Sequence, residues 1–220
     1  MQEIIKGIVI KKSDSGEFDE VISTLCKTGI YTFFSPGTRK INSKNAMSLS
    51  LLDFTNFEIL TRNEITNLLP RLKTATLIYK FPLDYQNAEF QETLLYFLNK
   101  IKASNYLDFI ETYEKLLPMV GHNKNNKVLV YLINKILKCE GIYPVYSGCV
   151  ECGRQKGLID FQFHKGGFLC YEHSTFELGV NKLNALYYLN KDFDSFDKNT
   201  THDVVDFLKN ILIAYLTEYF

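Results

Sequence analysis

The amino-acid sequence predicts an α+β protein in which a small N-terminal β-barrel precedes a helical region, and a metal-binding hairpin interrupts the helices. Short apolar runs separated by turn residues fill the N-terminal third of the chain. Apolar residues at helical spacing follow, and a paired Cys and His motif lies among them. We expect the barrel over residues 1–78 and the helical domain over residues 79–220, with the hairpin inserted at about 147–176.

The expected barrel is built from short strands. Apolar runs cover residues 4–10, 21–25, 30–35 and 54–60, and a fifth run at 72–79 is expected to combine strand with some helix. Turn sequences such as Ser13-Asp14-Ser15-Gly16 separate the runs. Short strands at this density are typical of a small closed barrel such as an OB-fold, and an SH3-like barrel fits the pattern almost as well.

Positive charge is concentrated within the barrel region. No Asp or Glu occurs from residue 21 to residue 52, whereas this segment carries Lys27, Arg39, Lys40 and Lys44. Basic side chains on polar loops can neutralise the phosphates of a nucleic acid, so these four residues are the candidate nucleic-acid contacts. The alternative is a loop whose charges only solvate the surface.

Aromatic residues precede the basic loop at residues 36–45. The third expected strand contains Tyr31, Phe33 and Phe34. Rings beside basic residues can stack on the bases of a single strand. The alternative is that they are ordinary core aromatics.

The region from residue 85 to residue 140 changes to a helical period. Pro118 and Gly121 interrupt it, and Gly141 and Pro144 end it. Further apolar stripes at helical spacing lie at residues 180–189 and 202–220. We expect these stripes to form the core of the helical domain.

The hairpin carries two pairs of candidate metal ligands. Cys149 and Cys152 have C-x2-C spacing, Cys170 and His173 have C-x2-H spacing, and residues 153–169 separate the pairs. Each short turn can supply one edge of a tetrahedron, and the linker can form a hairpin that joins the two edges. The motif therefore predicts one structural Zn²⁺ ion.

Three alternatives to a structural zinc site remain. The thiols could be buried by chance, as free Cys often is. A disulfide is disfavoured because Cys26 and Cys139 stand alone and no secretory signal is apparent. A catalytic zinc hydrolase, with Glu151 as its base, would need an open ligand position, and four candidate ligands leave none.

Composition limits the remaining functions. The 25 basic and 25 acidic residues cancel, so any nucleic-acid site must be local. The sequence contains no Walker A loop, G-x-G-x-x-G or G-x-S-x-G motif, and we expect a binding protein rather than an enzyme. No apolar run approaches the length of a membrane span, so we expect a cytoplasmic protein. An RNA-binding barrel and zinc-ribbon protein of translation or transcription is the alternative.

Two segments carry a resemblance to a known family. They are GIVIKKSDSGEFDEVISTLCKTGIYTFFSPGTRK at residues 7–40 and GIYPVYSGCVECG at residues 141–153. In their order and spacing the chain resembles the RecO family of bacterial recombination-repair proteins over nearly its whole length. The resemblance implies an OB-fold, a helical domain and a zinc module. It also implies a non-enzymatic, nucleoid-associated mediator that binds single- and double-stranded DNA and anneals complementary strands.

The resemblance further implies partners and site residues. Members of the family engage RecR and the C-terminal tail of the single-strand-binding protein SSB, and indirectly help to load RecA. Arg39 and Lys40 match the basic corner associated with DNA contact. The motif Cys149, Cys152, Cys170 and His173 matches the metal positions, although many members have Cys as the fourth ligand. An apolar groove on the helical domain would hold the SSB tail, and one candidate helix carries Lys127, Lys135 and Lys138.

Overall fold

The computed structural model of the protein describes residues 2–61 and 68–220. The chain divides into two compact units, Met1–Asn125 and Asn126–Phe220. The domain boundary predicted near residue 78 falls inside the first unit and stays a prediction.

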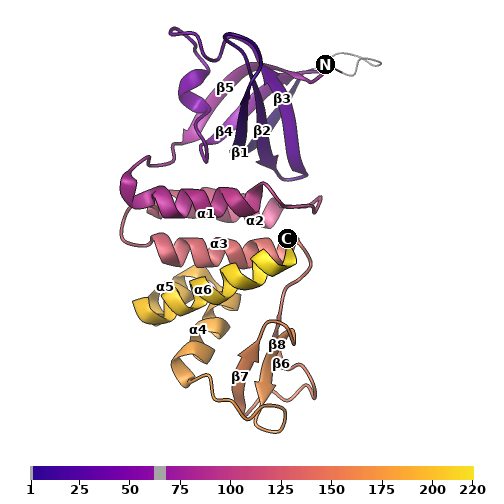
Figure 1. Cartoon of the computed structure of the whole chain (residues 1–220), viewed down its shortest axis with the longest axis vertical. Coiled ribbons are helices and arrows are strands. Elements are labelled where there is room, and N and C mark those ends of the chain that lie inside the picture. The colour runs from indigo at the N-terminus through magenta and orange to yellow at the C-terminus, as the bar shows by residue number, and fades with distance from the viewer. Residues whose placement is uncertain (1, 62–67) are drawn as a thin grey trace. The chain divides into compact units, whose positions relative to one another are not determined.

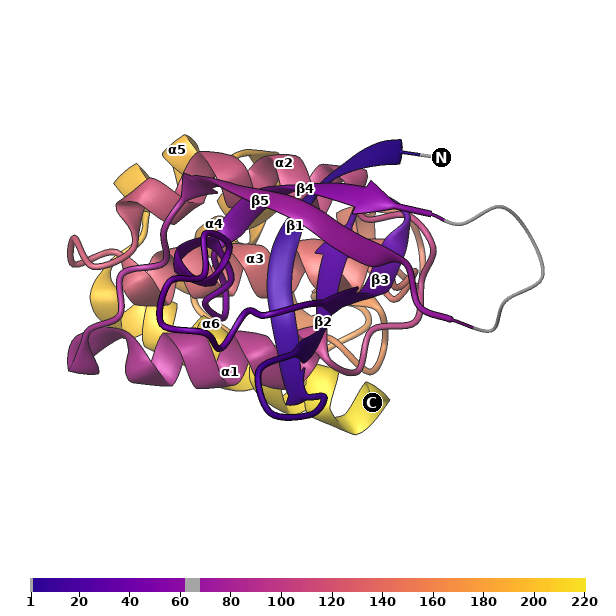
Figure 2. The same cartoon turned by 90° about the horizontal axis from the view of Figure 1, so that it is seen from above.

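Five strands form a closed barrel in the first unit, with the order β1-β2-β3-β5-β4 (Figures 1 and 2). They are β1 (Gln2–Asp14), β2 (Glu20–Cys26), β3 (Gly29–Ser35), β4 (Phe54–Leu60) and β5 (Arg71–Tyr79). Neighbouring strands are antiparallel except for β3 and β5, which meet in parallel where Phe34 lies opposite Arg71. The predicted barrel is confirmed, and its strand order is that of an OB-fold.

The barrel interior is filled by apolar side chains that alternate along the strands. The core cluster contains Val9, Ile22, Phe33, Leu49, Phe57, Ile59 and Leu72. Strand β1 is irregular between Val9 and Lys11, and it pairs with β4 through its first half and with β2 through its second half. Strand β5 is extended throughout, so the helix expected within residues 72–79 is wrong.

Helices α1 (Ala88–Leu98) and α2 (Leu107–Leu116) complete the first unit at one end of the barrel (Figure 1). Short 3-10 turns are η1 (Ala46–Ser48), η2 (Tyr85–Asn87) and η3 (Leu117–Met119). Backbone and side-chain hydrogen bonds join this end to the helices. The amide of Tyr106 donates to the carbonyl of Lys27 at 2.8 Å, and Asn99 Nδ2 donates to the carbonyl of Ile10 at 3.2 Å.

The second unit combines helices with a small sheet. Its elements are α3 (Asn125–Cys139), β6 (Val145–Cys149), β7 (Leu158–Gln162), β8 (Gly167–Cys170), α4 (Val180–Lys191), α5 (Phe193–Asn199) and α6 (His202–Tyr219). Helix α5 lies outside the two C-terminal stripes recognised in the sequence. Asp192 begins it by accepting a 2.7 Å hydrogen bond from the amide of Ser195, which is a normal N-cap interaction.

Helix α3 anchors both parts of the second unit. The ring of Tyr131 lies 5.3 Å from that of Phe193, and Lys127 Nζ lies 3.0 Å from Asp197 Oδ1. The small sheet is attached through Tyr146, whose hydroxyl donates to Asn134 Oδ1 at 3.2 Å. Among the described residues, none of the helices has the length and hydropathy that a membrane span requires.

Candidate metal centre and nucleic-acid interface

The sheet topology of the second unit brings the two ligand pairs together. Strands β6 and β8 are parallel neighbours in the order β6-β8-β7. Cys149 is the last residue of β6 and Cys170 is the last residue of β8. Because parallel neighbouring strands end at the same edge, the turns that follow them lie side by side.

The first turn is a tight knuckle at residues 149–154. The amide of Cys149 donates to the carbonyl of Arg154 at 2.8 Å, and the amide of Gly153 donates to the carbonyl of Cys149 at 2.8 Å. A Cβ atom at Gly148 would lie 2.9 Å from the carbonyl oxygens of both Gly153 and Arg154. Only glycine fits at residue 148 without displacing the knuckle backbone.

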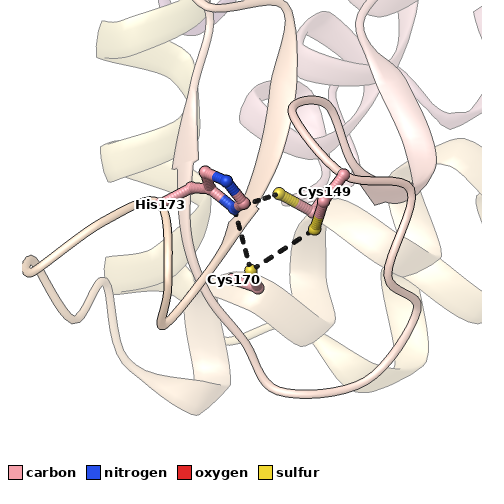
Figure 3. A group of neighbouring side chains, drawn as sticks. Cys149, Cys170 and His173 are labelled. Atoms are coloured by element: carbon pink, nitrogen blue, oxygen red, sulfur yellow. Dashed lines mark hydrogen bonds between the residues drawn. The ribbon is translucent and has the colours of Figure 1, made fainter.

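The second turn repeats this arrangement after β8. The amides of His173 and Ser174 both donate to the carbonyl of Cys170, at 2.9 and 3.0 Å. This turn directs the imidazole of His173 toward the thiols of Cys149 and Cys170 (Figure 3).

Distances between the donor atoms fit a tetrahedral metal site. His173 Nδ1 lies 3.6 Å from Cys149 Sγ and 3.3 Å from Cys170 Sγ, and Cys152 Sγ lies 3.8 Å from Cys170 Sγ. All four donor atoms lie within 4.8 Å of one another. A tetrahedral ion with metal–sulfur bonds of about 2.3 Å has sulfur–sulfur edges of about 3.8 Å. The four residues could therefore bind one metal ion, and four donors are the number found in closed structural sites.

The pKa values of the four candidate ligands shift in different directions. The hydrogen bond with Cys170 raises the pKa of His173. Despite the amide of Arg154, burial together with the neighbouring thiols raises the pKa of Cys152, whereas the pKa values of the other two thiols are lowered. Burial raises the pKa of the Cys149 thiol, but amide groups of Cys170, Cys152 and Glu151 around its sulfur outweigh this effect and lower the pKa to about 6. The hydrogen bond with His173 lowers the pKa of Cys170. Since the thiolate is the ligand form of Cys, these surroundings prepare two ligands for a cation.

The basic corner predicted at Arg39 and Lys40 lies against the turn between β1 and β2. Arg39 Nη1 lies 2.8 Å from Asp14 Oδ2, and the Arg39 amide donates to the carbonyl of Phe18 at 2.9 Å. Lys40 Nζ lies 5.7 Å from the centre of the Phe18 ring. The structure thus brings two of the four candidate DNA contacts together.

The other two candidates lie elsewhere. Lys27 is exposed in the turn between β2 and β3, whereas Arg39 follows the far end of β3. A strand of this length extends for roughly 20 Å, so Lys27 is separated from the basic corner by the length of β3. Lys44 is exposed beside Asn45, whose Oδ1 accepts a 3.0 Å hydrogen bond from the amide of Ala75 on β5.

The three aromatic residues of β3 have different environments. Phe33 is fully buried and its ring lies 5.2 Å from that of Phe57, so of the two interpretations of this residue the core aromatic is confirmed. Tyr31 packs against the core cluster, and its hydroxyl donates to Glu3 Oε1 at 2.6 Å. Phe34 is half-buried and follows Phe33 on the opposite face of the strand.

Strand pairing places further residues beside Phe34 on the outer face of the barrel. One cross-strand row consists of Ser13, Val21, Phe34 and Arg71. Exposed Lys11 lies opposite Ser23 in the adjacent row. Sequence reasoning missed Lys11 and Arg71. Alternation from the core residue Leu72 would have placed Arg71 outside, but Lys11 faces out only because β1 is irregular between Val9 and Lys11. The pairing of β3 with β5 has no local signal in the sequence.

Comparison with known proteins identifies relatives along most of the chain. No protein-family model matches it. A DNA repair protein RecO of Acetivibrio thermocellus is 24% identical over 226 aligned positions, covering 96% of this chain and 89% of that protein. The RecO protein of Latilactobacillus sakei is 26% identical, covering 85% of this chain and 71% of the relative. That of Mycoplasma mycoides is 33% identical, covering 69% of this chain and 64% of the relative.

The chain belongs to the RecO family. The mixed architecture of an N-terminal closed barrel and a helical part with a Cys3His cluster is consistent with the RecO assignment. The resemblance drawn from residues 7–40 and 141–153 is thereby confirmed.

Proposed function

We propose that this RecO-family chain is a mediator of DNA repair and homologous recombination. In this role it binds single- and double-stranded DNA, promotes annealing and, with RecR, assists the loading of RecA on SSB-coated strands. The observation that carries the proposal is similarity to RecO proteins that extends over 96% of the chain in one relative. The closed barrel supports it, because OB-folds commonly bind oligonucleotides on the face that includes strands 2 and 3.

The DNA surface of the proposal is the outer face that carries Phe34 and Arg71, together with the basic corner of Arg39 and Lys40. Basic side chains at both edges of the face would contact phosphates while the Phe34 ring offers a stacking surface. The ion pair of Arg39 with Asp14 is solvent-exposed on both sides. Such pairs contribute about 0–1 kcal/mol, so a phosphate can replace the carboxylate.

Annealing then follows from charge neutralisation and requires no bond to be made or broken. Two single strands repel each other through their phosphates. A protein that neutralises phosphates on both lowers this repulsion and lets base pairing begin. The proposed protein is a DNA-binding mediator and not an enzyme.

The metal in the proposal is one structural Zn²⁺ ion bound by Cys149, Cys152, Cys170 and His173. Three thiolates and an imidazole at tetrahedral spacing are a typical zinc ligand set. The buried cluster around the ligands contains Cys149, Leu169 and Cys170, so two of its three members are ligands themselves. Because the ligands make up most of this cluster, the ion would contribute directly to the folding of the hairpin.

The partners in the proposal are RecR and the C-terminal tail of SSB, with RecA reached indirectly. An SSB site is expected on the helical part of the chain. Of the three lysines considered for it, Lys127 already forms an ion pair with Asp197. A pull-down at low and high salt would show whether RecR and SSB bind.

The proposal is tested by DNA affinity, its salt dependence and strand annealing in a variant with Arg39, Lys40 and Lys44 changed to Ala. We expect weaker binding, a salt slope smaller by up to about 3, and slower annealing. A matched control changes exposed Lys156, Lys165 and Lys198 to Ala. Equal affinity and salt slope in both variants would contradict the DNA-binding role of all three residues. Preference for structured RNA over single-stranded DNA would favour the RNA-binding alternative.

A further inference from the structure

A buried carboxylate lies beside the metal cluster. Asp160, on β7, is 1% exposed. Ile159 is an extra residue in the pairing of β7 with β8, because Leu158 lies opposite Cys170 while Asp160 lies opposite the adjacent Leu169. Such bulges often redirect a side chain next to a functional site.

Three donors surround the carboxylate. Asp160 Oδ1 accepts a 2.7 Å hydrogen bond from the amide of Phe161, and Oδ2 accepts bonds from Gln162 Nε2 at 2.6 Å and Ser174 Oγ at 2.8 Å. Burying a carboxylate is costly unless its oxygens are hydrogen-bonded, and these bonds offset that cost. An apolar side chain could fill the same space at no such cost, so the hydrogen-bond partners of this carboxylate indicate its role.

The bond to Ser174 reaches the metal ligands. Ser174 follows His173 directly, and its amide donates to the carbonyl of Cys170. The Ser174 hydroxyl also accepts a 3.2 Å hydrogen bond from the amide of Phe176. Asp160 is therefore hydrogen-bonded, through the Ser174 side chain, to the turn that carries Cys170 and His173.

Asp160 itself is not one of the ligands. Among the described residues, the cluster of donor atoms within 4.8 Å of one another contains three Cys and one His and does not include this carboxylate. It lies outside the ligand set and is hydrogen-bonded to the turn that carries two of the ligands, as residues that orient ligands are. Outer groups of this kind typically contribute 10–100-fold to metal affinity.

We propose that Asp160 is a positioning residue of the metal site, which holds the turn of Cys170 and His173 in its ligand geometry through Ser174. This inference rests on the metal site proposed above. Asp160 thus links β7 to the ligands, and the second turn is already ordered when the ion binds.

The test measures Zn²⁺ affinity of the full chain by competition with a chelator. The variants are Asp160→Asn, Ser174→Ala and the double variant, and the control is Glu151→Gln. Glu151 is exposed between Cys149 and Cys152, so the control removes a negative charge beside the ligands without removing the bond to Ser174. We expect each single variant to bind about 10–100-fold more weakly, the double variant to lose less than the product of the two losses, and the control to match the wild type.

Co²⁺ absorption separates ligand geometry from general stability. We expect the Co²⁺ bands of Asp160→Asn and Ser174→Ala to differ from those of the wild type, while Glu151→Gln keeps them. If Asp160→Asn does not fold, Ser174→Ala still tests the same bond. Wild-type affinity and spectra in both single variants would overturn the inference alone. A wild type that binds neither ion would overturn the metal site as well.

Discussion

Tyr113 Oη donates a 2.6 Å hydrogen bond to the carbonyl oxygen of Leu52, a residue with a φ of 66°. Left-handed backbone at a residue other than glycine costs about 1–3 kcal/mol and persists only where its surroundings hold it. Leu52 is fully buried, and its amide donates to the carbonyl of Val9 at 2.8 Å. Helix α2 thus supports a strained corner that leads the chain into β4.

Replacing Tyr113 with Phe is expected to lower the free energy of unfolding of the first unit by about 1–3 kcal/mol. The reason is that the buried carbonyl of Leu52 loses its donor while packing of the ring is kept. Denaturant unfolding measures this loss. Tyr85→Phe is the control, because Tyr85 is 93% exposed. Equal stability of the two variants would show that the bond does not support the corner.

The buried carboxyl group of Asp53 is expected to make the stability of the protein depend on pH. Burial raises the pKa of this carboxyl group even though the amides of Phe81 and Ser50 donate to it. A folded-state pKa above the unfolded value means that the folded protein gains stability as pH falls through that raised pKa toward about 3.9. The unfolding free energy of the wild type minus that of Asp53→Asn should therefore increase on acidification in this range, because only the wild type carries the titrating carboxyl group.

Asp192 is the control of opposite sign for this titration. Hydrogen bonds from the amide and hydroxyl of Ser195 lower the pKa of Asp192. Its contribution is present above the unfolded value and is lost as pH falls through the lower folded pKa. The difference between wild type and Asp192→Asn should shrink on acidification. A parallel pH response of both variants would contradict the two assignments.

Metal analysis provides the prediction for the cluster. We expect one zinc ion per wild-type chain and a loss of the ion in Cys152→Ser, with a lower melting temperature because the ligands make up most of the buried cluster that joins the two turns. The control is Cys139→Ser, since Cys139 lies outside the cluster. Retention of the ion by Cys152→Ser, or its loss from Cys139→Ser, would argue against the ligand set.

The outer face of the barrel predicts separate contributions from charge and stacking. Arg71→Ala should reduce the salt slope of DNA binding by about 1 for single- and double-stranded DNA alike. Phe34→Ala should weaken single-stranded binding by about 1–3 kcal/mol and leave duplex binding less affected, because only unpaired bases can stack on the ring. Fluorescence anisotropy with both kinds of DNA measures each effect. An unchanged affinity for both variants would place DNA elsewhere on the chain.

Local patterns in the sequence were sufficient for several features of this protein. The spacing of Cys149, Cys152, Cys170 and His173 predicted the cluster, because a short turn between two ligands brings them close wherever it occurs. The strands and helices also follow local rules of alternation, helical period and turn chemistry. Helix α5 was not predicted from the sequence, because its seven residues are too few to show a helical period.

Only the tertiary structure decided which distant residues share a surface. The basic stretch suggested one site, but β3 separates Lys27 from Arg39, and the pairing of β3 with β5 instead puts Arg71 beside Phe34. Phe33 and Phe34 are adjacent in sequence, yet only Phe33 is fully buried. Asp160 likewise gained its role from a bond to Ser174, fourteen residues away. Strand pairing depends on contacts between residues far apart in the chain, and no short window of sequence contains both partners.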